Sequence, residues 1–139
     1  MVDKDIISVK ILHVNECLGR LQEKKNIKKE LFLRNKDAQD IVLHNLQTAI
    51  QGCIDIASHI ISDEQWQIPG NVTGLFDVLK ERKVINAKTS EILRKMAGFR
   101  NIIVHEYEDI DFEKVYDIFK NCMPDFKSYL KQIILFTRI

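Results

Sequence analysis

Hydrophobic residues recur along this chain every three or four positions, which is the spacing of an amphipathic α-helix. The first set of these hydrophobic residues forms a narrow stripe after Asp3, and an aspartate at this position can cap the N-terminus of a helix. A second stripe begins near Asn35 or Asp37 and continues to about Ser62, and its width suits a helix at the centre of a bundle. The first stripe is Ile7, Ile11, Val14, Leu18 and Leu21, and the second is Val42, Leu46, Ala49, Cys53, Ile56 and Ile60.

The second half of the chain predicts three further helices. The sequence Pro69-Gly70-Asn71 breaks the chain before a short helix over about residues 73–82. Asn86 can cap the next helix, and Asp111 can cap a last one that continues into the final residues. Pro124 lies inside this last segment, so we expect a kink or a break there.

Length and composition indicate how many domains the chain forms and in which compartment it works. The 139 residues are 45% hydrophobic and 29% charged, as in ordinary globular domains, and no apolar run approaches the ~20 residues that span a bilayer. The polar start, residues 1–5, is unlike a secretory signal, and Cys17, Cys53 and Cys122 fall on apolar helical positions without zinc spacing. We therefore expect one all-α domain over residues 1–139, an up-and-down bundle of about five helices, in the cytoplasm and away from membranes.

The net charge of +1 argues against binding of nucleic acid through a strong overall basic field. Basic residues nevertheless crowd the connection between the first two predicted helices. They are Lys24, Lys25, Lys28, Lys29, Arg34 and Lys36. A solvated helix end, where cations are favoured, is the default interpretation, and a phosphate-contacting patch is the alternative.

Residues that can act on a phosphodiester gather at the end of the helix that Asn86 caps. The motif is Arg-x4-His-x-Tyr, formed by Arg100, His105 and Tyr107. Arginine offers a planar fork of donors to phosphate oxygens, and histidine titrates near neutrality, so it can serve as general base or acid. Asn101 can orient the histidine or the substrate. Each residue also has an ordinary explanation, as a surface cation, a helix cap or a core aromatic, and the three together favour a function.

Helical geometry limits how these residues can cooperate. At about 100° per residue, Tyr107 lies about 20° from Arg100 on the helical wheel, whereas His105 lies about 140° from it. One helix cannot readily hold a single phosphate between Arg100 and His105. Either the helix unwinds at His105, or a second copy of the chain completes the site across a two-fold axis.

The string from Phe99 to Tyr107 resembles the signature of HEPN-domain ribonuclease toxins of the HepT-like family, which are encoded beside minimal nucleotidyltransferase antitoxins. The likeness extends as helix order from about Asp37 to Ile134. It implies a HEPN-like fold, a homodimer with a composite cleft, and metal-independent cleavage of RNA without a cofactor. It also implies catalytic roles for Arg100 and His105, a catalytic or substrate-orienting role for Asn101, and adenylylation of Tyr107 by the antitoxin.

The sequence allows two interpretations of each of three features: the function of the chain, its acidic segment and its polar stripe. The protein could be a non-catalytic helical subunit that docks a nucleotidyltransferase and presents its substrate, although the intact motif favours an enzyme. The five carboxylates of residues 106–113 form either a solvated loop or a surface for the antitoxin. A polar stripe on the second helix forms a solvent face by default, or otherwise the wall of a cleft; it comprises Asp40, His44, Gln47, Gln51 and Asp55.

Overall fold

The computed structural model describes residues 1–105 and 109–139, with side chains for all of these except 103–105. The described part of the chain contains seven helices and no strand, which confirms the all-α prediction. It contains no helix that is both long and apolar enough to cross a bilayer. The helices are α1 (Lys4–Glu23), α2 (Lys29–Phe32), α3 (Lys36–Asp63), α4 (Val72–Glu81), α5 (Ala87–His105), α6 (Phe112–Asn121) and α7 (Met123–Thr137).

The helices begin where the sequence places capping residues. The carboxylate of Asp3 accepts backbone N–H groups of the first turn of α1, and that of Asp111 does the same for α6. The side-chain oxygen of Asn86 accepts the backbone N–H of Thr89 at 2.8 Å, which begins α5. Each cap satisfies a backbone donor that the helix itself leaves unpaired.

Two features of the observed fold differ from the predicted set of about five helices. The helix α2 spans only four residues inside the first connection, too short for any periodicity in the sequence to indicate it. The last predicted helix is divided into α6 and α7 beside Pro124, which lies in the first turn of α7. This break is the expected one, because proline has no N–H to continue a helix but fits its first turn.

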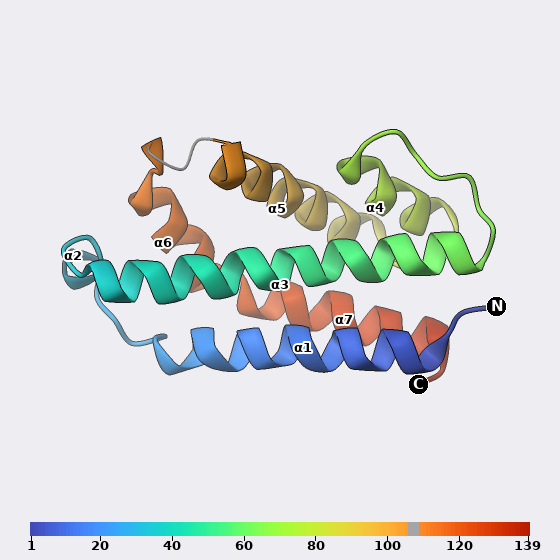
Figure 1. The fold of residues 1–139 in the computed structure, drawn as a ribbon, viewed down its shortest axis with the longest axis horizontal. Helices are drawn as coiled ribbons and strands as arrows, with labels where there is room; N and C mark the ends of the chain where they lie inside the picture. Colours follow the sequence, from blue (N-terminus) through green and yellow to red (C-terminus); the bar gives the residue numbers. More distant parts are fainter. Residues whose placement is uncertain (106–108) are drawn as a thin grey trace.

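The central element is α3, and half of its 28 residues are buried. Figure 1 shows α4 and α5 along one side of α3, and α1 and α7 along the other. The helix therefore has the broad apolar face that the sequence predicts. The phenol of Tyr129 on α7 is fully buried and donates to the carbonyl oxygen of Cys53 on α3 at 2.9 Å, which fixes α7 against the central helix.

The three cysteines are free and buried. Burial raises the pKa of the Cys122 thiol to about 12 and also raises the pKa of the Cys17 and Cys53 thiols. All three therefore remain protonated and unreactive at neutral pH, as core residues do. This agrees with the placement of cysteines on apolar helical positions in the sequence.

A close approach in the core joins α1 and α3 at Gly52. A Cβ atom added at this glycine would lie 2.4 Å from Cγ2 of Val14, well inside van der Waals contact. Val14 is fully buried, and its branched side chain has few other rotamers to adopt. The absence of a side chain at Gly52 is thus a condition for the observed packing of α1 on α3.

We predict that Gly52→Ala lowers the free energy of unfolding by about 1–3 kcal/mol, because the added methyl group pushes α1 away from α3. The matched control is Gly19→Ala on α1, where an added Cβ meets no atom within 4 Å. Alanine is the better helix former, so the control should gain up to about 1 kcal/mol. Urea unfolding followed by circular dichroism measures both; equal stabilisation in the two variants would contradict the packing described.

Candidate functional site

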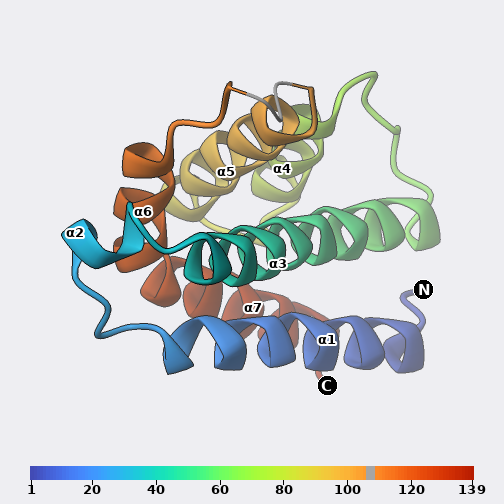
Figure 2. The same ribbon diagram turned by 60° about the vertical axis from the view of Figure 1, so that its left-hand side comes forward.

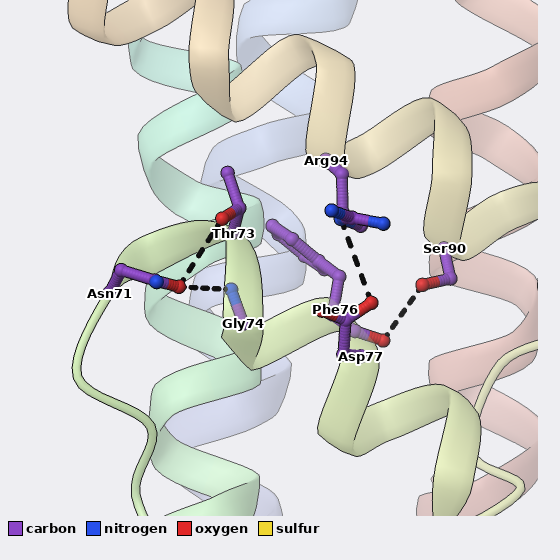
Figure 3. A network of polar contacts seen from close by, with 7 residues as sticks. All are labelled: Asn71, Thr73, Gly74, Phe76, Asp77, Ser90 and Arg94. Atoms are coloured by element: carbon purple, nitrogen blue, oxygen red, sulfur yellow. Dashed lines mark hydrogen bonds and ion pairs between the residues drawn. The ribbon is translucent and has the colours of Figure 1, made fainter.

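The motif helix α5 is held in place along its first half by polar contacts with α4 (Figure 3). The hydroxyl of Ser90 donates to the carbonyl oxygen of Phe76 at 2.9 Å, and this bond is buried. Nearer solvent, Arg94 Nε lies 3.6 Å from a carboxylate oxygen of Asp77. The cap of α4 lies in the same network, where Asn71 Oδ1 accepts the N–H of Gly74 at 2.7 Å.

A second set of contacts fixes the start of α5 to α7. Gln132 Oε1 accepts the backbone N–H of Asn86 at 2.7 Å, and Gln132 Nε2 donates to the hydroxyl of Thr89 at 2.7 Å. The beginning of α5 is therefore bound on two sides. Its C-terminal turns, which carry the motif, project from this fixed base.

Arg100 differs from an ordinary surface cation. Its side chain is half-buried, and its Nε is buried without a hydrogen-bond partner among the described residues. By contrast Arg94, on the same helix, is 49% exposed and paired with Asp77. Helical periodicity alone does not predict that this nitrogen is buried. A buried N–H without a partner costs about 1–3 kcal/mol, so this donor calls for an explanation beyond stability.

The other motif residues are described to different extents. Asn101 is half-buried, and its side chain forms no hydrogen bond with a described residue. His105 is the last residue of α5, so the backbone remains helical between it and Arg100, while its side chain lies outside the description. Tyr107 lies outside the described residues, together with Glu106 and Glu108 of the acidic segment 106–113. The cooperation of Arg100, His105 and Tyr107 thus stays a prediction.

An open groove of about 570 Å³ lies next to the motif turn, between α5, α6 and the start of α7, but neither Arg100 nor Asn101 lines it. Its α5 wall is mainly apolar and ends at Ile102, which is 48% exposed and adjacent in sequence to Asn101. Ile92, Met96, Phe99 and Ile103 recur at helical spacing, which predicts a buried side of α5. Met96 and Phe99 are buried, Ile92 is half-buried and lines the groove, and the side chain of Ile103 lies outside the description.

Charged groups stand along this groove. Lys95 and Lys114 line it from α5 and α6, and Asp117 and Asp125 line it from α6 and α7. The pattern of the sequence did not reveal the groove, because it exists only where α6 and α7 separate. The break expected at Pro124 was the one signal for it.

The polar stripe on α3 does not line this groove. Asp40 and His44 are exposed, and Gln47, Gln51 and Asp55 are half-buried. Gln51 donates to the carboxylate of Asp55 at 2.9 Å, one turn along the same helix. The described contacts therefore place the stripe on the outer face of α3, which is the default interpretation.

Comparison with known proteins connects this architecture to a group of nucleases. Residues 14–133 match the family model described as "Ribonuclease HepT-like". The mRNA nuclease HepT of Shewanella oneidensis is 33% identical over 129 residues, which cover 93% of this chain and 96% of that protein. The tRNA nuclease HepT of Aphanizomenon flos-aquae is 28% identical over 95% of this chain and 90% of its own length.

Solved structures show the same fold. The tri-AMPylated HEPN toxin of Shewanella oneidensis, in complex with its MNT antitoxin, superposes with a TM-score of 0.86 at 33% identity. The superposition covers 94% of this chain and 98% of that one. The cytosolic protein YutE of Bacillus subtilis matches with a TM-score of 0.85 at 18% identity, a likeness of fold alone.

Proposed function

This chain belongs to the HepT-like family of ribonucleases, and we propose that it is the metal-independent endoribonuclease toxin of a toxin–antitoxin pair. The observation that carries the proposal is the state of Arg100. Its Nε is buried and lacks a partner among the described residues, at the end of a helix whose base is firmly held. A charged donor kept unsatisfied in this way is preorganised for an anionic ligand, and a phosphodiester is such a ligand.

The chemistry then follows from the side chains of the motif. RNA carries its own nucleophile, the 2′-hydroxyl, which must lose a proton as it attacks phosphorus. The 5′-oxygen must gain one as its bond to phosphorus breaks. His105 performs proton transfer as base or acid, and Arg100 binds the oxygens on which negative charge accumulates. Asn101 is half-buried beside Arg100 and orients either the histidine or the substrate.

We infer that the working cleft forms between two copies of the chain. The backbone of α5 is helical through His105, so Arg100 and His105 remain about 140° apart around the helix axis. A two-fold axis beside the motif helix would bring Arg100 of one copy toward His105 of the other. The exposed side chain of Ile102 gives this face an apolar contact of the kind that interfaces bury.

We infer further that a nucleotidyltransferase antitoxin silences the toxin by AMPylation. The Shewanella oneidensis toxin is tri-AMPylated in its complex with the MNT antitoxin. In this chain the motif tyrosine, Tyr107, is the proposed acceptor. An adenylyl group adds a negative charge and a bulky nucleotide near Arg100, which excludes RNA phosphates by repulsion and occlusion.

One prediction from the proposed function concerns the catalytic pair. Arg100→Ala and His105→Ala should each abolish RNA cleavage and growth inhibition, with a rate loss of about 10²–10⁴ for removal of a general acid or base. His105→Ala should leave the free energy of unfolding within about ±0.5 kcal/mol. Arg100→Ala should not lower it, because the substitution removes a buried N–H that has no partner among the described residues. Cleavage of labelled RNA and urea unfolding measure the two effects.

Arg94→Ala is the matched control for this prediction. It removes a cation from the same helix and breaks the exposed ion pair with Asp77, so stability should fall by up to about 1 kcal/mol while cleavage persists. Wild-type activity should also persist in excess EDTA. Normal cleavage by the His105 variant, or loss of wild-type cleavage in EDTA, would refute the mechanism. A wild-type protein that binds its antitoxin but never cuts RNA would instead support a non-catalytic binding subunit.

A further prediction from the proposed function concerns Tyr107. Co-expression with the proposed nucleotidyltransferase antitoxin should raise the intact mass by one or more AMP units, which peptide sequencing should locate at Tyr107. Tyr107→Phe keeps the ring and removes the acceptor hydroxyl, so this site should no longer be modified and the toxin should remain active beside its antitoxin. Unchanged modification of the variant, or modification that leaves cleavage untouched, would contradict the assigned role.

A further inference from the structure

The connection between α1 and α3 concentrates positive charge on an otherwise nearly neutral protein. We call residues 24–36 the basic segment; it carries six cations and one carboxylate, a net charge of +5, so the remainder of the chain carries −4. In the described structure none of these six cations forms an ion pair. Lys25, Lys28, Lys29, Arg34 and Lys36 are exposed. Their charges are therefore available to an external anion.

The basic segment is fastened to α6. The phenol of Tyr116 donates to the carbonyl oxygen of Ile27 at 2.7 Å, and the ammonium of Lys120 donates to the carbonyl oxygen of Lys25. Phe32 of α2 is fully buried and packs against aromatic rings of α6, with its ring centroid 5.3 Å from that of Tyr116. These contacts fix the position of the basic segment relative to α6.

The same helix separates the basic segment from the groove beside the motif. One side of α6 contacts α2, and Lys114, Asp117, Ile118 and Asn121 of α6 line the groove. Figures 1 and 2 both show α2 and α6 at the same end of the bundle, and Figure 1 shows the C-terminal end of α5 turned toward that end. The basic segment therefore lies roughly one helix diameter, about 10–12 Å, from the groove. The intervening helix α6 carries no net charge, because Glu113 and Asp117 balance Lys114 and Lys120. The excess positive charge at this end of the bundle therefore lies in the basic segment itself.

We propose that the basic segment is an RNA-docking surface that binds the sugar-phosphate backbone beside the cleavage site. This inference rests on the proposed nuclease function and assigns it a substrate-binding surface. Four of the five exposed cations are lysines, which are depleted at protein–protein interfaces and suited to phosphates. Carboxylates next to them are Glu23, Glu30 and Asp37, too few to neutralise the segment. Contacts of this kind set affinity and position without reading sequence.

The test replaces the four exposed lysines of the segment, Lys25, Lys28, Lys29 and Lys36, with glutamine. The matched control replaces four exposed lysines elsewhere, Lys4, Lys80, Lys127 and Lys131, and changes the net charge equally. Binding of a long single-stranded RNA is measured by fluorescence anisotropy over a series of salt concentrations. His105→Ala is present in every protein so that no RNA is cut.

The segment variant should bind at least about tenfold more weakly at low salt than the control. Its plot of log affinity against log salt should be shallower by about 0.7 for each RNA phosphate that the variant no longer neutralises. With His105 restored, the segment variant should show a higher KM for the long RNA and an unchanged kcat. It should cleave a short oligonucleotide spanning only the cut site as the control does.

Equal affinities and equal salt slopes for the two variants would overturn the proposal. Loss of antitoxin binding with unchanged RNA binding would also overturn it and assign the segment to the protein partner. Failure of this docking proposal can be distinguished from failure of the proposed nuclease function. A wild-type protein that binds RNA through this segment but never cleaves it would support the docking surface and refute the proposed activity.

Discussion

Burial of the long helix α3 on several sides at once is the constraint on which the other helices depend. α1 can approach it closely only because Gly52 has no side chain to meet Val14. α7 is fixed to it by the buried bond from Tyr129 to the carbonyl of Cys53. Once α7 is packed on α3, it fixes the start of α5, because Gln132 of α7 accepts the backbone N–H of Asn86 at the N-terminus of α5. The position of the motif is thus set by contacts distant from the motif.

The two halves of the motif helix α5 differ in how far their polar groups are paired. In its first half the polar groups are paired: the Ser90 hydroxyl binds a buried carbonyl oxygen, and Asn86 caps the first turn. Its second half carries a guanidinium whose Nε lacks a partner in the described structure. The two arginines of this helix illustrate the difference. Arg94 forms an ordinary exposed ion pair, and Arg100 is half-buried and unpaired at Nε among the described residues. Local instability of this type is expected at a site whose ligand supplies the missing interaction.

Much of this fold could be predicted from residues alone, because helix periodicity and capping are local. Asp3, Asn86 and Asp111 begin helices as expected, and Pro124 lies at a break. The four-residue α2 could not be predicted, since it is too short to show periodicity and part of its packing is against α6, far along the chain.

The candidate site was less predictable than the fold. The motif residues are visible in the sequence, but the groove depends on how α6 and α7 separate, and the burial of Arg100 Nε depends on packing around α5. No pattern of residue types indicates that Tyr107 accepts an adenylyl group. That role came from family resemblance and stays a prediction, as do the placements of His105 and Tyr107 in the cleft.

The central claim is that Arg100 of one copy acts with His105 of the other, and mixed dimers test it most directly. Differently tagged Arg100→Ala and His105→Ala chains, co-expressed and purified through both tags, retain one Arg100 and one His105 on opposite copies. The account predicts that this mixed protein sediments as a dimer and cleaves RNA, although each parent is inactive. A mixed dimer as inactive as its parents, or full activity from a clean monomer of the wild-type chain, would contradict it.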